Sequence, residues 1–243
     1  MPTLFISDLH LDDARPQVTG LFGRFVDGEA RGADALYILG DLFEAWVGDD
    51  DPSEAGAYVA AKLRSLADGG VPVFFMRGNR DFLVGPAYAD RAGMTLLHDP
   101  SVVMLYGRPV LLMHGDTECT DDVAYQQFRA QSRDPRWQAQ FLAQPLAARQ
   151  GFADQARAAS RAHQAGLREA GAMDAITDVT PATVEATLRR FGIDTLVHGH
   201  THRPAVHDLA VDGRACQRIV LGDWHEQGSV LRVDPSGFNL STL

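Results

Sequence analysis

The chain has 243 residues, of which 45% are hydrophobic, and its formal net charge is −10. This length and composition suffice for one substantial core with a small appended unit. The acidic balance argues against a nucleic-acid partner, which would require a basic footprint, and two cysteines are too few for a disulfide framework.

Short apolar runs alternate with helix-compatible stretches along the chain. Segments 21–30 and 53–67 indicate helices, and a further helix is expected from Thr180 to about Arg190. The apolar runs are rich in Val, Ile, Leu or Phe, which is typical of buried strands. The six predicted strands are 3–6, 35–39, 71–76, 110–113, 195–197 and 218–221. This alternation predicts an α/β protein in which helices cover a layered sheet.

The stretch 122–170 has a different character, because it carries no strand signal. It is rich in Ala, Gln and Arg, and its seven arginines stand against four acidic residues. Aromatic and leucine side chains are spaced through it. We expect a helical insertion at 122–170 within a core formed by 1–121 and 171–243.

Five of the predicted strands end in a short polar cluster. Residues two apart on an extended segment point the same way, so Asp8 and His10 can bind one cation together. Carboxylates with imidazoles suit Mn, Zn or Fe, and a carboxylate such as Asp41 can bridge two ions. Two such ions activate water and stabilise in-line displacement at phosphorus. The clusters are Asp8-Leu9-His10, Gly40-Asp41, Gly78-Asn79-Arg80-Asp81, His114-Gly115-Asp116 and His198-Gly199-His200-Thr201-His202.

Taken singly, each cluster has an ordinary structural explanation, such as a surface pair or a turn. Together, Asp-x-His, Gly-Asp, Gly-Asn-x-Asp, His-Gly and Gly-His-x-His resemble the motifs of the calcineurin-like metallophosphoesterases. The resemblance implies a four-layer αββα sandwich with two metal ions, most simply Mn²⁺, at the strand ends. It implies that one ion is held by Asp8, His10, Asp41 and His202, and the other by Asp41, Asn79, His114 and His200. His198 would lie outside the ligand set.

A finer resemblance covers nearly the whole chain. The segments 35–46, 47–51, 78–82, 113–117, 119–122 and 198–204 are similar to those of the UDP-2,3-diacylglucosamine pyrophosphohydrolase family of lipid A biosynthesis. This implies attack of water on the α-phosphorus, giving UMP and 2,3-diacylglucosamine 1-phosphate. It also implies a monomer on the cytoplasmic face of the inner membrane, in peripheral contact with it. The implied substrate contacts are Asn79, Arg80, Asp122, Ser160 and His200, with Gln164 where an Asn is expected and Arg168 nearest an expected Lys.

Arg80 supports the choice of a pyrophosphate substrate. Many superfamily members carry a histidine after the motif Asn, where it can act as general acid. Arginine does not donate a proton at working pH, but it can clamp phosphate oxygens and neutralise developing charge. A phosphate leaving group departs without being protonated. We therefore expect Asp41, Asn79, Arg80 and His114 to form the catalytic set.

Several alternatives remain open from the sequence. The arginines and aromatics of the insertion could hold a phosphorylated sugar and acyl chains, or lie on an anionic membrane surface. For most of the apolar residues, ordinary helix packing is the favoured interpretation. A soluble nucleotide-sugar pyrophosphatase, another two-metal phosphodiesterase, a DNA-processing phosphoesterase and a non-catalytic metal-bound scaffold are the competing functions.

Overall fold

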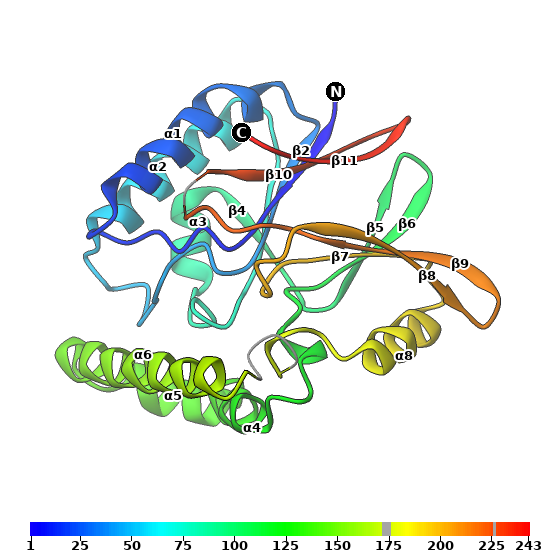
Figure 1. The fold of residues 1–243 in the computed structure, drawn as a ribbon. Helices are drawn as coiled ribbons and strands as arrows, with labels where there is room; N and C mark the ends of the chain where they lie inside the picture. Colours follow the sequence, from blue (N-terminus) through cyan, green and yellow to red (C-terminus); the bar gives the residue numbers. More distant parts are fainter. Residues whose placement is uncertain (172–175, 226) are drawn as a thin grey trace.

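A computed structural model describes residues 1–171, 176–225 and 227–243 of the chain. Its strands form two sheets (Figure 1). The first has the order β11-β10-β1-β2-β3-β4, and the second has the order β5-β6-β7-β9-β8. The first sheet contains β1 (Thr3–Ile6), β2 (Ala35–Leu39), β3 (Val73–Met76), β4 (Met94–Leu97), β10 (Ser229–Asp234) and β11 (Gly237–Thr242). The second contains β5 (Ser101–Leu105), β6 (Arg108–Leu112), β7 (Thr195–His198), β8 (Ala205–Val211) and β9 (Arg214–Val220).

The two sheets pack face to face between layers of helices. Phe5 and Tyr37 of the first sheet stack with ring centroids 4.8 Å apart, and they share a core cluster with Leu112 and Val197 of the second. The outer face of the first sheet is covered by α1 (Pro16–Asp27), α2 (Glu54–Asp68) and α3 (Pro86–Ala92). The outer face of the second is covered by α8 (Pro181–Phe191). The predicted four-layer αββα sandwich is thereby confirmed.

The six strands predicted from the sequence all occupy interior positions in the sheets. The four edge strands β4, β5, β8 and β11 were not predicted. Each is partly exposed, and β4, β8 and β11 lack a continuous apolar run, whereas the apolar run 102–105 of β5 was overlooked. β10 was also missed, since Arg232 interrupts it. That side chain is accommodated by an ion pair to Glu29, with Nε 2.5 Å from Oε1.

Two predicted helix boundaries also needed correction. The helix expected over 21–30 starts earlier, at Pro16, where the fixed φ of proline suits the first turn. It ends at Asp27, and a separate 3₁₀ turn, η1, spans Glu29–Gly32. The helix α3 was missed. The helix expected from Thr180 is present as α8, and Thr180 takes its N-cap position.

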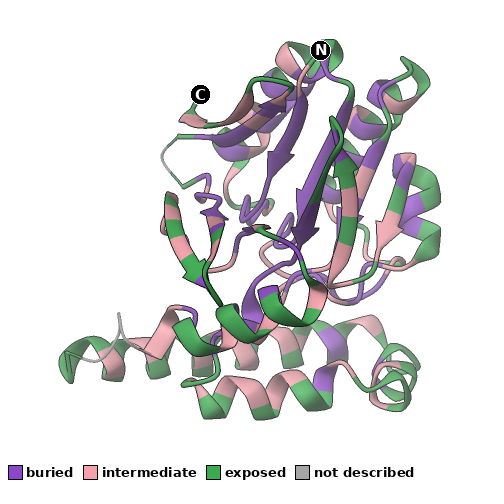
Figure 2. Cartoon of the chain, turned by 90° about the vertical axis from the view of Figure 1, so that its right-hand side faces the viewer, coloured by how far each residue is buried: buried purple, intermediate pink, exposed green. Residues whose placement is uncertain are grey.

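The stretch 122–170, predicted to be an insertion, forms the helices α4 (Val123–Ser132), α5 (Pro135–Leu142) and α6 (Leu146–Glu169). These helices lie together below the sandwich in Figure 1, and most of their surface is exposed or half exposed (Figure 2). Phe141 of α5 is buried in the core cluster of the first sheet, and the Trp137 ring stacks on it at 4.9 Å. In the described part of the chain, no helix combines the length and apolarity needed to cross a membrane.

Candidate metal centre

Strands β1, β2 and β3 run parallel, as do β6, β7 and β9. The carboxyl ends of parallel strands meet at one edge of a sheet, so the polar clusters after these strands come together. Asp8 and His10 follow β1, Asp41 follows β2, and His200 and His202 follow β7. The fold therefore gathers candidate ligands that are up to 194 residues apart in sequence.

The backbone at these positions is unusual. Asp8, His10, Asp41, His200 and His202 have φ values of 57°, 50°, 52°, 68° and 56°. Non-glycine residues rarely adopt this left-handed backbone conformation, and residues that do adopt it are concentrated at functional sites. Among the residues that the structure describes, the other non-glycine positions with positive φ are Tyr106 and Asp212. Each is followed by glycine in a tight β-hairpin turn, which explains its conformation.

The first group of ligand atoms contains Asp8, His10 and His202. His202 Nε2 lies 3.3 Å from Asp8 Oδ1 and 3.1 Å from His10 Nε2. His10 Nε2 also lies 3.8 Å from Asp41 Oδ2. All three side chains can point one ligand atom at a common position.

The second group contains Asp41, Asn79, His114 and His200. Asn79 Oδ1 lies 2.9 Å from His114 Nε2 and 2.8 Å from His200 Nδ1. Asp41 Oδ1 lies 3.7 Å from His114 Nε2. Asp41 therefore directs one carboxylate oxygen to each group. This arrangement suits a carboxylate that bridges two cations, and the mixed oxygen and imidazole donors fit Mn, Zn or Fe.

The electrostatics of the centre favour positive charge. Burial opposes protonation of His114, yet the carboxylates of Asp41, Asp116 and Asp8 raise its pKa to about 9. For His202, burial is again outweighed, and Asp8 and Asp223 raise the pKa to about 10. In contrast, burial lowers the pKa of His200 to about 4. A surplus of buried carboxylate that attracts protons is a setting in which divalent cations fit.

Two close approaches explain why the motifs contain glycine. A β-carbon at Gly78 would lie 2.2 Å from Asp41 Oδ1, and one at Gly199 would lie 2.3 Å from Asp8 Oδ2. Asp81, the last residue of Gly-Asn-Arg-Asp, is fully buried. Its carboxylate accepts hydrogen bonds from the backbone N–H of Gly78 and of Leu42, both at 2.7 Å. Asp81 thus holds the loop after β2 against the loop after β3.

The backbone of Arg80 contacts the carboxylate of Asp41. Its backbone N–H donates to Asp41 Oδ1 at 2.8 Å, and its Nη1 lies 3.8 Å from Glu44 Oε1. Glu44 was missed from the sequence, although a charged residue directly after Leu42-Phe43 was a usable signal. Glu44 Oε2 lies 3.2 Å from His10 Nδ1. Burial opposes its ionisation, but His10, Arg80 and Arg15 lower its pKa to about 2.

The insertion contacts the centre through the start of α4. The Tyr125 ring lies 5.8 Å from the His200 ring, and Tyr125 Oη donates to Asp116 Oδ2 at 2.5 Å. Arg129 Nε also donates to Asp116 Oδ2, at 2.8 Å. Asp116 is fully buried. These bonds join the predicted insertion to the loop that carries His114.

The substrate contacts expected on the insertion are only partly brought together. Asp122 caps α4 by accepting from the Tyr125 N–H at 3.0 Å, and its Oδ1 lies 3.5 Å from His163 Nε2 of α6. Ser160 and Gln164 are half buried and stand one turn apart on α6, whereas Arg168 is exposed. His198 is fully buried and belongs to neither ligand group, and its Nδ1 lies 2.8 Å from the Gly199 carbonyl oxygen.

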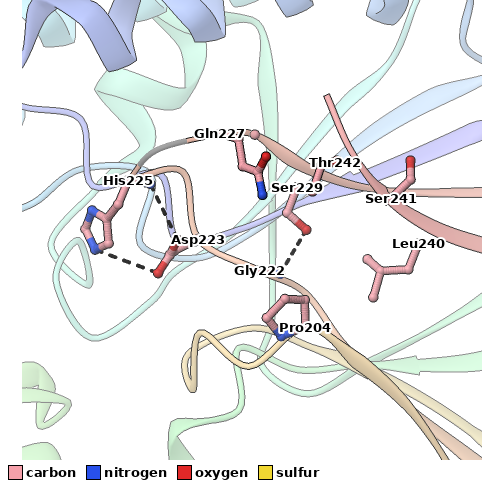
Figure 3. A pocket seen from close by; sticks show the side chains of 10 residues that line it. Pro204, Gly222, Asp223, His225, Gln227, Ser229, Leu240, Ser241 and Thr242 are labelled. Atoms are coloured by element: carbon pink, nitrogen blue, oxygen red, sulfur yellow. Dashed lines mark hydrogen bonds and ion pairs between the residues drawn. The ribbon is translucent and has the colours of Figure 1, made fainter.

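Asp223 and His225 also reach the centre and were missed. They follow the predicted strand 218–221, so their signal was the same as for the other five clusters. Asp223 Oδ2 lies 3.2 Å from His202 Nδ1 and 3.9 Å from His225 Nε2. The two side chains point toward each other at the rim of a cavity (Figure 3).

The sequence matches the family model of the calcineurin-like phosphoesterases over residues 1–204, a range that includes all residues of the two predicted ligand groups. The chain belongs to the calcineurin-like phosphoesterase family. Its αββα fold and the predicted family are thereby confirmed. Of solved structures with the same fold, an archaeal phosphodiesterase aligns over 100% of both chains at a TM-score of 0.50 and 13% identity.

Curated relatives within this family are far more similar. A protein of Stenotrophomonas maltophilia strain K279a is 63% identical over 245 residues, covering 100% of this chain and 99% of its own length. A protein of Xanthomonas axonopodis pv. citri is 64% identical, with the same coverage. Both are named UDP-2,3-diacylglucosamine hydrolase. These relatives confirm the predicted resemblance to the UDP-2,3-diacylglucosamine hydrolases.

Proposed function

We propose that this phosphoesterase hydrolyses the pyrophosphate bond of UDP-2,3-diacylglucosamine in lipid A biosynthesis. Water attacks the α-phosphorus, and the products are UMP and 2,3-diacylglucosamine 1-phosphate. The proposal rests mainly on Asp41, whose two oxygens serve two ligand groups beside Arg80. Full-length identity of 63–64% to hydrolases named for this substrate supports the same choice.

The residues of the centre have distinct parts in this reaction. Two divalent cations, when bound, supply Lewis-acid activation of water and neutralise charge on the phosphoryl group. Asp8, His10, Asp41 and His202 would hold one, and Asp41, Asn79, His114 and His200 the other. Mn²⁺ is the ion we propose for both positions.

The Arg80 guanidinium, partly exposed and 3.8 Å from Glu44 Oε1, binds phosphate oxygens of the substrate. It stabilises the charge that develops as the bond to the leaving phosphate breaks. That leaving group is a phosphate monoester, so no residue has to protonate it. The absence of a histidine at position 80 is therefore compatible with a pyrophosphate substrate.

The insertion 122–170 is proposed as a lid over the sugar and acyl chains, with 1–121 and 171–243 as the catalytic core. Asp122, Ser160, Gln164, Arg168 and His200 would contact the substrate. Val123, Leu142 and Phe152 expose apolar surface on these helices. Such side chains together with arginines suit peripheral contact with the cytoplasmic face of an inner membrane. We propose a monomer that binds no nucleic acid.

The experiment is to incubate the metal-loaded protein with UDP-2,3-diacylglucosamine and to quantify UMP and the lipid product. Asp41→Asn provides the matched control, because it keeps the side-chain shape but removes the charge shared by both groups. We expect UMP release from the parent protein and a loss of at least about 100-fold in the variant. Equal, low release from both would reject the proposal.

A soluble nucleotide-sugar pyrophosphatase is the second candidate. One observation favours it: Phe141 and Phe152 pack on each other with centroids 5.3 Å apart, and Trp137 packs on both. These aromatic side chains therefore pack against one another and do not need acyl chains as packing partners. Equal turnover of acylated and unacylated UDP-glucosamine would favour this candidate, whereas strong preference for the acylated substrate would favour the lipid hydrolase.

A further inference from the structure

We propose that Asp223 is a positioning residue that orients His202 for cation binding. Its carboxylate accepts the Nδ1–H of His202, which leaves the lone pair of Nε2 directed at the position shared with Asp8 and His10. The inference rests on the proposed metal centre. It concerns a residue outside both ligand groups assigned above.

The distances place the two nitrogens of His202 in different surroundings. Nδ1 lies 3.2 Å from Asp223 Oδ2. Nε2 lies 3.3 Å from Asp8 Oδ1 and 3.1 Å from His10 Nε2. A neutral imidazole carries its proton on one nitrogen only, and the group bonded to that nitrogen decides which one it is. With a carboxylate at Nδ1, the nitrogen that remains free to bind a cation is Nε2.

The position of Asp223 is fixed by its neighbour Trp224. The Trp224 side chain is fully buried, and its Nε1 donates to the Ser229 carbonyl at 3.2 Å. The backbone N–H of Trp224 donates to the Asp8 carbonyl at 3.2 Å. The segment that carries Asp223 is thus tied directly to the loop after β1. Asp223 and the ligand Asp8 are consequently held at a set separation across His202.

His225 and Arg15 support this orientation from the outer side. Arg15 Nη1 lies 3.0 Å from His225 Nδ1. A guanidinium only donates, so His225 Nδ1 accepts and the proton of His225 lies on Nε2. That Nε2 is the atom 3.9 Å from Asp223 Oδ2. Asp223 therefore has imidazole N–H groups on two sides.

A cation at this outer position is the competing arrangement, because His202, Asp223 and His225 could themselves form a ligand group. The guanidinium of Arg15 next to His225 opposes it, since it places a positive charge where the cation would bind. Arg15 also donates to the His10 backbone carbonyl, which holds it in place. We therefore assign Asp223 to hydrogen bonding.

Asp223 and His202 are only partly enclosed by neighbouring side chains. A cavity of about 510 Å³ is lined by Asp223 and His225, together with Pro204, Gln227 and Leu240 (Figure 3). Asp223 and His202 are each 29% exposed. The His202 ring also packs against the rings of His10 and His225, with centroids 5.0 and 5.7 Å apart. These contacts do not select between its two nitrogens, so the hydrogen bond to Asp223 determines which nitrogen faces the cation. Loss of such an outer partner typically lowers metal affinity about 10–100-fold.

The test measures Mn²⁺ binding to the full-length apoprotein by calorimetric titration and by the EPR signal of the coupled pair. The variants are Asp223→Asn and Asp223→Glu, and Asp212→Asn is the control, because Asp212 pairs with Arg189 far from the centre. We expect two ions per chain in the parent protein. Asp223→Asn should weaken one of them about 10–100-fold and spare the other. Asp223→Glu should recover part of this loss, and Asp212→Asn should match the parent.

Several results would overturn the inference. Unchanged affinity for both ions in Asp223→Asn would show that Asp223 does not orient His202. Three ions in the parent and two in the variant would make Asp223 a ligand. Equal weakening of both ions with a lowered melting temperature of the apoprotein would indicate a structural role. If the parent binds two ions but releases no UMP, the proposed function fails while this inference stands.

Discussion

Arg149 of α6 donates to both carboxylate oxygens of Asp50, with Nη1 2.8 Å from Oδ1 and Nη2 2.5 Å from Oδ2. Asp50 lies in the loop between β2 and α2, so this pair joins the insertion to the sandwich. The Arg149 side chain is only 3% exposed, whereas that of Asp50 is 65% exposed. The same guanidinium donates to the Val47 carbonyl at 2.6 Å. Arg149 is therefore a buried attachment point of the insertion.

Arg149→Ala should loosen the insertion without disturbing the metal centre. The change removes the buried guanidinium together with its hydrogen bonds to Asp50 and to the Val47 carbonyl. The free energy of unfolding should therefore fall by about 1–3 kcal/mol. KM for the acylated substrate should rise, while the metal content stays at two ions. Steady-state kinetics and metal analysis check this. Asp50→Asn keeps an acceptor for Arg149 and should have a smaller effect; loss of metal in Arg149→Ala would contradict the assignment.

Arg80→Ala should lower kcat by about 10²–10³-fold, which is typical for loss of a group that stabilises transition-state charge. Metal content should not change, because the bond from residue 80 to Asp41 uses the backbone N–H. Arg80→Lys should recover part of the rate as a point charge. The measurement is kcat together with metal stoichiometry. A variant that loses metal would show that the side chain supports the centre instead.

Phe141→Ala and Phe152→Ala should separate packing from substrate binding. Phe141 is 5% exposed within the core cluster, so its truncation should lower the free energy of unfolding by about 3–5 kcal/mol. Phe152 is 39% exposed and should affect stability less. If Phe152 contacts acyl chains, its truncation should raise KM for the acylated substrate alone. Chemical denaturation and kinetics with both substrates distinguish the two roles.

Asp99→Asn should stabilise the protein at neutral pH. Burial, and then the charge of Asp116, raises the pKa of Asp99 from 3.8 to about 6. Neither carboxylate oxygen has a hydrogen-bond partner among the described residues. Because the folded state binds the proton more tightly than the unfolded state, the Asp99 carboxyl destabilises the fold as pH rises from about 4 to 6. The gain should reach up to about 3 kcal/mol above pH 6.

The pH dependence supplies the control for this prediction. Below about pH 3, Asp99 is protonated in both states, so parent and variant should unfold with nearly equal free energies. Thermal or urea unfolding from about pH 3 to pH 8 provides the measurement. A gain of the same size at every pH would assign the effect to packing instead of charge.

The sequence was informative where burial is continuous. Strands enclosed on both faces appear in the sequence as apolar runs, and the candidate ligands directly follow them. Asp8, Asp41 and His200 could therefore be located in advance. The edge strand β8 could not, because it alternates half-exposed and exposed positions and its apolar residues are interrupted by His207 and Asp208. Asp223 could also have been predicted as a site residue from the sequence, since it follows the predicted strand 218–221. Its role depends on the 3.2 Å distance to His202, which only the fold provides.

Long-range pairs were beyond sequence reasoning. Arg149 was one of seven arginines in the insertion, and nothing local distinguished it from Arg136 or Arg161. Its importance comes from burial against a carboxylate 99 residues earlier. Glu44 is a similar case, because its importance comes from its contacts with His10, Arg15 and Arg80, which the fold brings together.

The most direct test of the central claim is hydrolysis of UDP-2,3-diacylglucosamine in ¹⁸O-labelled water with Mn²⁺, followed by mass spectrometry of both products. Attack of water on the α-phosphorus predicts one ¹⁸O atom in UMP and none in 2,3-diacylglucosamine 1-phosphate. Label in the sugar phosphate would contradict the assigned bond cleavage. Intact substrate in the presence of protein carrying two ions would contradict the proposed reaction itself.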